Sequence, residues 1–298
     1  MVQQNQGKRT DVSIIIVNYN TSELTAKCVD SIIEKTTDIE YEIIVVDNAS
    51  KEDTGILEHN NNIRFVASDT NLGFGKANNL GAKDARGEYL FFLNPDTYLI
   101  NNAIYILHKA MSENRETGIC GGNLFKKDMT PNHSFQLRFP GIWAELTDTV
   151  SKVFHRRNRD FNYSDKPKEV AYITGADLMI KKDLFDEVGG FDKDFFMYFE
   201  ETYLCHSVKS LGYKIMNIPD AHIVHLEGSS FKLKTSREDL FHTSQKLFLN
   251  KTHRSVSYYY FFKIAFIINN SIKYLLMLLT LNERKSIILY RIKKMING

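Results

Sequence analysis

Cysteine pairs and a secretion signal are both missing from this 298-residue chain. Its three cysteines, Cys28, Cys120 and Cys205, lie far apart and are odd in number, without a Cys-X-X-Cys pair or a Cys/His zinc spacing. We therefore expect reduced thiols in a cytosolic protein rather than disulfides or structural zinc. The first eleven residues are polar and contain no apolar run, so we expect no signal peptide.

Long apolar runs and common nucleotide signatures are missing as well. The stretch 257–279 is apolar and aromatic, but Lys263, two asparagines and Lys273 interrupt it. A membrane-spanning helix needs about 20 apolar residues with few charges, so this segment does not fit one. The glycine-rich stretch 73–85 has neither the GxGxxG pattern of dinucleotide-binding proteins nor the Lys-Ser ending of a P-loop.

Charge is distributed unevenly along the chain. The net charge is only +2, yet residues 251–298 hold nine Lys/Arg and one acidic residue, Glu283. The rest of the chain is therefore mildly acidic, which is not a nucleic-acid-binding pattern. We expect the C-terminal segment to form amphipathic helices that lie on an anionic membrane surface. An oligomer interface is the alternative for the same apolar faces.

Buried strands alternate with helices through the first two-thirds of the sequence. Runs such as VSIIIVNYN and EYLFFLNPD are apolar and then end in polar residues, which is typical of strands buried on both faces. This order predicts an α/β fold with a mostly parallel sheet and right-handed crossovers. The expected strands are 12–20, 41–50, 62–68, 88–96, 119–124, one near 170 and one or two in 213–230; the expected helices follow Ser22 and cover 51–59, 73–85, 101–112 and 198–213.

Polar clusters close three of these strands: Asn18-Tyr19-Asn20, Asp47-Asn48 and Asn94-Pro95-Asp96. Ligands of open α/β sheets bind outside the carboxyl ends of the strands. We therefore expect the three clusters to meet at one edge of the sheet.

Six motifs in order then show a family resemblance over about residues 11–230: SIIIVNYN, VVDNAS, NLGFGKANNLG, FLNPDT, TGADLMIKKDLFDEVGGFDKDFFMYFEE and HIVHLEGSS. The chain resembles the inverting GT-A glycosyltransferases of family two, especially the bacterial branch that contains rhamnosyltransferases of surface polysaccharide synthesis. The resemblance implies a GT-A fold, Rossmann-like, with residues 1–230 as the catalytic domain and 231–298 as a helical extension.

The resemblance also implies a divalent cation, Mn²⁺ or Mg²⁺, that neutralises the leaving diphosphate. Asp96 takes the place of the metal ligand in the family's DxD motif. Asn94 is a departure from that motif and, as an amide, would belong to the donor-binding residues by orienting the ribose or a metal-bound water. His225 matches a histidine near the metal and the diphosphate. The alternatives are a helix N-cap for Asp96 and an ordinary structural role for His225. His222 would point to the opposite face of a strand.

Nucleotide and sugar contacts are implied for a further group of residues. Asp47 matches the position that reads the nucleobase, although an Asx-turn is its alternative. Asn18 and Tyr19 would flank the base, or simply form a turn. The resemblance places Asn71, Gly73 and Asn79 on the nucleotide side and Asp177 near a sugar hydroxyl, with helix packing as the alternative for Asn79.

Glu200 and Glu201 occupy the family's Glu-Asp position at the start of a helix. The resemblance makes Glu201 the base that removes the acceptor proton, with Glu200 as the second candidate. Two departures stand out: Glu201 is one methylene longer than aspartate, and Tyr203 replaces a frequent second aspartate. The alternative is a pair of acids favoured by the helix dipole.

The expected function is metal-dependent transfer of a sugar, with inversion, from a nucleoside diphosphate to a hydroxyl of a cell-surface glycan or lipid-linked precursor. dTDP-rhamnose is the first donor and a UDP-sugar the second. We expect a cytoplasmic enzyme at the inner face of the membrane, without nucleic acid partners, and a homo-oligomer is possible. A catalytically impaired, nucleotide-sugar-binding partner subunit is the alternative. A nucleotidyltransferase is disfavoured because NYNTSELT lacks glycines and basic residues.

Overall fold

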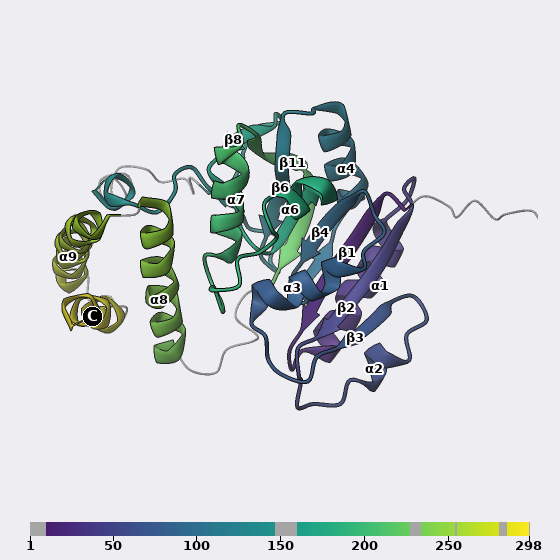
Figure 1. The fold of residues 1–298 in the computed structure, drawn as a ribbon, viewed down its shortest axis with the longest axis horizontal. Helices are drawn as coiled ribbons and strands as arrows, with labels where there is room; N and C mark the ends of the chain where they lie inside the picture. Colours follow the sequence, from purple (N-terminus) through teal and green to yellow (C-terminus); the bar gives the residue numbers. More distant parts are fainter. Residues whose placement is uncertain (1–9, 147–159, 227–233, 254, 280–284, 298) are drawn as a thin grey trace, which may run out of the picture. The chain divides into compact units, whose positions relative to one another are not determined.

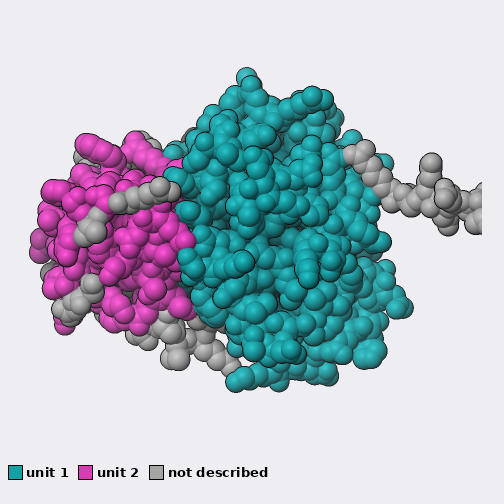
Figure 2. Space-filling model, in the orientation of Figure 1, with its two compact units in different colours: residues 1–137, 159–232 teal, residues 138–158, 233–298 magenta. Residues whose placement is uncertain are grey.

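A computed structural model describes residues 10–146, 160–226, 234–253, 255–279 and 285–297. The chain divides into two compact units, which we describe separately (Figure 2). The first comprises residues 1–137 and 159–232, and the second comprises 138–158 and 233–298. The second unit therefore includes the insertion 138–158 as well as the C-terminal helices.

A nine-stranded sheet forms the centre of the first unit, in the order β3-β2-β1-β4-β10-β6-β11-β5 with β8 paired to β11 (Figure 1). A second, two-stranded sheet pairs β7 (Phe135–Gln136) with β9 (Tyr172–Ile173). The strands of the large sheet are β1 (Val12–Asn18), β2 (Tyr41–Asp47), β3 (Arg64–Ala67), β4 (Tyr89–Leu93), β5 (Thr97–Leu99), β6 (Thr117–Phe125), β8 (Lys168–Val170), β10 (Asp177–Lys181) and β11 (Lys214–His225).

The sheet is mixed but mostly parallel where the sequence predicted βαβ units. Strand β1 is parallel to β2 and β4, β2 is parallel to β3, and β6 is parallel to β11. Strand β10 runs antiparallel between β4 and β6, and β5 runs antiparallel to β11. The predicted α/β fold is therefore confirmed, while the orientation of β10 was not foreseen.

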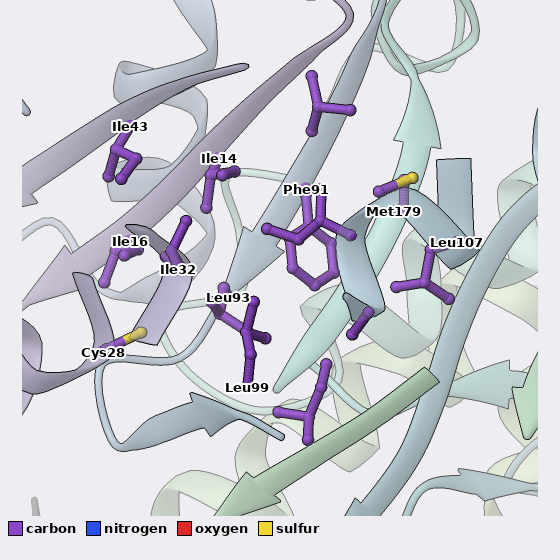
Figure 3. Packing of buried hydrophobic residues seen from close by; sticks show 14 of the residues in the cluster. Ile14, Ile16, Cys28, Ile32, Ile43, Phe91, Leu93, Leu99, Leu107 and Met179 are labelled. Atoms are coloured by element: carbon purple, nitrogen blue, oxygen red, sulfur yellow. The ribbon is translucent and has the colours of Figure 1, made fainter. Parts of the chain in front are cut away.

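Helices cover both faces of this sheet. One face packs against α1 and α4, and Figure 3 shows Ile14, Phe91 and Leu93 among the side chains of that core. Alternate residues point to the other face, where Ile15 meets α3 and Phe92 contacts the Phe185 ring. The helices of the unit are α1 (Ser22–Lys35), α2 (Gly55–Glu58), α3 (Phe74–Lys83), α4 (Ala103–Glu113), α6 (Lys182–Glu187) and α7 (Glu200–Ser210).

The second unit is helical. It contains α8 (Lys234–His253), α9 (Val256–Leu279) and α10 (Lys285–Asn297). Ion pairs of 2.8 Å between Arg291 and Glu238 and of 2.6 Å between Lys294 and Asp239 join α10 to α8. Among the described residues, no helix has the length and apolar character needed to cross a membrane.

Candidate active site

The carboxyl ends of β1 and β2 bring the first predicted site residues together. Asn18 and Asp47 are register partners, and the Asn18 amide donates to Asp47 Oδ1 at 2.8 Å. Asn18 is fully buried, and its Oδ1 accepts the hydroxyls of Thr21 and Thr25. Its amide is thus engaged within the protein, which favours a role in positioning Asp47 over contact with a base. Tyr19, the next residue, is half-buried.

Asp47 also closes the turn that follows β2. The backbone N–H of Ser50 donates to Asp47 Oδ2 at 3.1 Å, which is the Asx-turn considered from the sequence. Each carboxylate oxygen accepts more than one hydrogen bond, so the turn does not exclude a further bond to a ligand. The predicted edge of polar side chains is therefore present, with Asp47 held on both oxygens.

Asn48 belongs to the predicted Asp47-Asn48 cluster, but the motif analysis gave it no role of its own. It is buried, its Oδ1 accepts the Leu72 N–H at 2.8 Å, and its amide donates to Asn71 Oδ1 at 3.1 Å. Asn71 in turn accepts the Gly73 N–H at 2.9 Å. This network fixes the loop before α3 beside the end of β2. The signal in the sequence was present, because Asn48 lies next to Asp47 in VVDNAS.

Gly73 serves a close backbone contact at the start of α3. Its φ is +79°, and a Cβ there would lie 2.2 Å from the carbonyl oxygen of Phe196. That carbonyl accepts the Phe74 N–H at 2.9 Å. The sequence suggested that this glycine lets a ligand approach, but the space is occupied by the segment that leads into α7.

Asp96 and His225 meet at the ends of β4 and β11. Asp96 Oδ1 lies 3.3 Å from His225 Nε2, and both side chains are largely buried. Asn94 Nδ2 is 3.4 Å from the same ring nitrogen. The other nitrogen of His225, Nδ1, is buried without a hydrogen-bond partner in the part of the chain that the structure describes. His222 packs its ring against Phe125, away from this pair.

The helix-cap alternative for Asp96 is wrong. Strand β5 begins at the next residue, and the following helix, α4, starts at Ala103 with Asn102 at its N-cap. Pairing of Thr97 with His225 aligns β5 and β11, and the Leu226 N–H donates to the Asp96 carbonyl at 3.0 Å. The proline-stiffened turn thus places the Asp96 carboxylate against His225. The remainder of the HIVHLEGSS motif, from residue 227 onward, lies outside the described residues.

The two glutamates open α7 and face different neighbours. A Cβ at Gly75 of α3 would lie 3.4 Å from Glu200 Cβ, and one at Gly175 would lie 3.7 Å from Glu201 Cβ. Burial raises the pKa of Glu200 well above its ordinary value, and the charge of Glu201 adds to this rise. Burial also raises the pKa of Glu201, while hydrogen bonds from the backbone and Thr202 oppose the rise. We assign the proton of the pair to Glu200, which leaves Glu201 as the group that ionises.

Strained backbone precedes the glutamates. Tyr198 and Phe199 both have φ of 68°, in the left-handed region that side-chain-bearing residues seldom adopt. Two such residues cannot extend the helix, so α7 begins at Glu200 and not at 198 as predicted. Conformations of this kind cost about 1–3 kcal/mol each and concentrate at functional sites.

Thr202 and Tyr172 support Glu201 and were not foreseen. The Thr202 hydroxyl donates to Glu201 Oε1 at 3.2 Å and shares a hydrogen bond with the Tyr172 hydroxyl. Burial and the Glu201 charge raise the pKa of Tyr172, which keeps the phenol protonated.

Backbone contacts join these clusters. The Asn94 N–H donates to the Ala176 carbonyl at 3.0 Å, and Ala176 follows the Gly175 that touches Glu201. On the other side, Gly73 contacts Phe196 in the segment before Glu200. The Asp96 and Glu201 clusters and the loop beside Asp47 are therefore parts of one region.

Two predicted site residues have their side chains bonded within the fold. Both sides of the Asn79 amide bind the Phe191 backbone, at 2.7 and 2.9 Å, which favours the helix-packing alternative. Asp177 is fully buried, and its Oδ2 accepts the Gly122 N–H at 2.5 Å. A side chain without exposed surface favours a structural role for Asp177 over a bond to a sugar hydroxyl. Burial raises the pKa of Asp177 well above its ordinary value.

Comparison with known protein families shows which family the chain belongs to. The sequence model described as "Glycosyl transferase family 2" matches residues 13–189. The chain belongs to this family. The matched range contains the ends of β1, β2 and β4 and the Asn94-Pro95-Asp96 turn, but it stops before Glu200 and His225.

Relatives of this family 2 chain are similar over more than half of its length. Glycosyltransferase GlyG of Streptococcus pneumoniae is 26% identical over 59% of this chain. The match covers 58% of the length of GlyG. Rhamnosyltransferase WbbL of Escherichia coli is 26% identical, covering 72% of the chain and 83% of WbbL. The N-acetylglucosaminyl-diphospho-decaprenol L-rhamnosyltransferase of Mycobacterium tuberculosis is 25% identical, covering 82% and 86%.

A solved structure shares the fold. GalNAc-T7, crystallised with UDP, GalNAc and Mn²⁺, superposes with a TM-score of 0.59 at 17% identity, covering 75% of the chain and 44% of GalNAc-T7. This likeness establishes the fold as GT-A, as the sequence motifs implied.

Proposed function

We propose that this family 2 protein transfers a sugar, with inversion, from a nucleoside diphosphate to a hydroxyl of a cell-surface glycan or lipid-linked precursor. The observation that carries the proposal is the Asp96–His225 contact, joined through residues 175–176 to Glu201. One side of this region has oxygen and nitrogen donors suited to a metal diphosphate, and the other has a carboxylate suited to a hydroxyl.

The donor set fits a cation that the substrate helps to hold. Asp96 and His225 supply one carboxylate and one imidazole, and no group of three His, Cys, Asp or Glu side chains gathers elsewhere among the described residues. Magnesium-like cations are commonly held by one or two carboxylates plus substrate phosphates. Mn²⁺ or Mg²⁺ would there neutralise the charge that develops on the leaving diphosphate.

Glu201 acts as the base in this proposal. A base must lose its own proton before it accepts one from the acceptor hydroxyl, and a raised pKa makes the carboxylate a stronger acceptor. Glu200 stays neutral beside it because two buried carboxylates do not ionise together at low cost. Asp47 would accept a ring N–H of uracil or thymine at the nucleotide end.

The donor class follows from the relatives. Two of the compared proteins are named rhamnosyltransferases, which favours dTDP-rhamnose as the first donor and UDP-sugars as the second. The mycobacterial name includes a decaprenol diphosphate, which favours a lipid-linked acceptor at the cytoplasmic face of a membrane. Both assignments belong to the proposal.

Isothermal titration with UDP and with dTDP, each with and without Mn²⁺, tests the cation and nucleotide site. We expect one nucleotide to bind in a metal-dependent manner and Asp96→Ala to weaken that binding by about 100-fold, because the variant loses a charged ligand. Asp128→Ala, an exposed aspartate, is the matched control and keeps wild-type affinity. If neither nucleotide binds to the folded wild type, the proposed nucleotide site is refuted. If a nucleotide binds equally well with and without metal, only the proposed role of the cation is refuted.

Glu201→Gln separates an active enzyme from an impaired binding subunit. The amide keeps the shape of the side chain but accepts no proton, so we expect turnover to fall by about 100-fold or more. The affinity for the nucleotide should stay unchanged in the same titration. If turnover survives the substitution, a group other than Glu201 is the base. If the wild type binds the donor but shows no turnover, the result supports the impaired-subunit alternative.

A further inference from the structure

Helix α9 exposes an apolar stripe. Among the side chains of α9 that the structure describes, six large apolar ones are exposed and recur at helical spacing: Tyr260 (60% exposed), Phe261 (63%), Ile264 (54%), Ile268 (51%), Ile272 (44%) and Leu275 (60%). At 100° per residue they fall within an arc of about 120°. Single exposed apolar residues are ordinary, but a continuous row of this length marks a contact surface.

The opposite side of α9 is already used within the second unit. Phe262 and Phe266 are buried, and the Asn269 amide donates to Glu145 Oε2 at 2.8 Å. The Ile142 N–H donates to the Tyr258 hydroxyl at 3.1 Å, so residues 141–145 run along this side of the helix. The fold of the unit therefore accounts for one face of α9 and leaves the stripe exposed.

Basic residues border the stripe. Helices α9 and α10 contain no acidic residue. The Lys263 ammonium donates to the Ile296 carbonyl at 3.3 Å, which places the end of α10 beside the first turns of α9. There Lys293 and Ile296 are exposed, so a cation and a further apolar side chain adjoin the stripe.

We propose that this stripe is a docking surface for an anionic lipid bilayer, with α9 lying in the plane of the membrane. An apolar face flanked by lysines on a helix that is too polar to span the bilayer is the pattern of interfacial helices. The side chains of the stripe enter the boundary between headgroups and acyl chains, and the lysines remain with the anionic headgroups. The proposal concerns the second unit and does not depend on the reaction assigned to the first.

The charge argues for lipid over a second copy of the chain. A twofold interface would bring the same stripe and the same lysines of two molecules together, since both partners use identical surfaces. The borders of α9 and α10 would then place cations opposite cations without acids from either helix. An anionic surface attracts the same lysines directly.

Flotation of the full chain with vesicles tests the surface. We expect the wild type to float with phosphatidylcholine vesicles that contain about one-third phosphatidylglycerol, and much less with pure phosphatidylcholine. Ile264→Ser/Ile268→Ser removes two central side chains of the stripe and should lower the partition coefficient by about tenfold or more. Both positions are exposed, so the fold should persist, and circular dichroism verifies this.

A matched double variant controls for the loss of surface apolarity. Ile56→Ser/Leu211→Ser changes two side chains with comparable exposure, 56% and 49%, in the first unit. We expect it to float like the wild type. Lys293→Gln should weaken flotation by about fivefold at low salt and less at high salt.

Three results would overturn the proposal: a wild type that does not float, a stripe variant that floats like the wild type, or a control variant that loses flotation equally. If flotation fails, sedimentation velocity tests whether the stripe is a dimer interface. A dimer that dissociates in Ile264→Ser/Ile268→Ser but persists in the control would show that a second copy, and not lipid, covers the stripe.

Discussion

Opposing influences act on the pKa of Glu201. Burial raises the pKa of this carboxyl, and the Thr202 hydroxyl, held in turn by Tyr172, stabilises its ionised form. A base of this kind works only when ionised, so activity should fall as the pH decreases through its pKa. The position of that acid limb reports how well Thr202 supports the charge.

Thr202→Val should move the acid limb of kcat/KM toward higher pH. The variant keeps the branched shape but loses the donor, so the pKa of Glu201 rises further. On the acid limb we expect a rate about fivefold below that of the wild type, converging at high pH where Glu201 is ionised in both. The pH profile of Thr202→Ser, which keeps the hydroxyl, should match the wild type. An unchanged limb in Thr202→Val would show that the bond does not tune the base.

The positions of candidate site residues were predictable where polar side chains end a strand. Asp47, Asn94 and Asp96 follow buried runs, and parallel pairing brings such ends to one edge. Asn79 and Asp177 were not predictable, because their partners, Phe191 and Gly122, are remote in sequence. Only the tertiary structure shows that these polar groups are already satisfied.

At the scale of elements, the start of α7 depends on the start of α3. In the segment before Glu200, the Phe196 carbonyl lies against Gly73. The chain then passes through two left-handed residues, Tyr198 and Phe199. Helix positions themselves were largely predictable from apolar periodicity. This entry into α7 was not, because φ depends on contacts that local sequence does not contain.

Gly73→Ala should therefore uncouple the two helices. The new Cβ would overlap the Phe196 carbonyl, so the segment before Glu200 must shift. A further cost of about 1–3 kcal/mol arises because φ of 79° with ψ of 175° is a backbone conformation essentially restricted to glycine. We expect at least about 2 kcal/mol of lost unfolding free energy and a fall in kcat of about 100-fold, since misplacement of catalytic groups by about 1 Å has that effect. Urea unfolding and steady-state kinetics measure the two quantities.

Gly189→Ala is the matched control. Gly189 has φ of +84° but nothing lies within 4 Å of an added Cβ. The substitution should cost about 1 kcal/mol of stability and leave kcat unchanged. Equal kinetic effects of the two variants would mean that the Phe196 contact does not position Glu201.

For the whole molecule, buried carboxyls set how stability depends on pH. Asp177 is fully buried with a raised pKa, and its Oδ1 has no hydrogen-bond partner among the residues that the structure describes. The folded state therefore binds a proton that the unfolded chain releases above about pH 4. Because the folded state binds more protons, the free energy of unfolding decreases as the pH rises above that value.

Asp177→Asn should remove this dependence. The amide oxygen can still accept the Gly122 N–H, and no proton has to be held. Urea unfolding at about pH 4, 6 and 8 should show the variant gaining on the wild type as the pH rises. Asp128→Asn, in which an exposed carboxyl with a lowered pKa is removed, should show no such gain. A constant difference between Asp177→Asn and the wild type would mean that Asp177 is ionised in the folded protein.

The antiparallel strand β10 also has a consequence for synthesis on the ribosome. Among the described strands, β4 and β6 are joined only through β10, and β5 pairs only with β11. A nascent chain that ends before Asp177 can assemble β1 to β4 but leaves β5 and β6 without neighbours. The reaction centre proposed here, which needs β11 for His225, becomes complete only when three-quarters of the protein has emerged. Until then the unpaired strand edges are those that chaperones would have to shield.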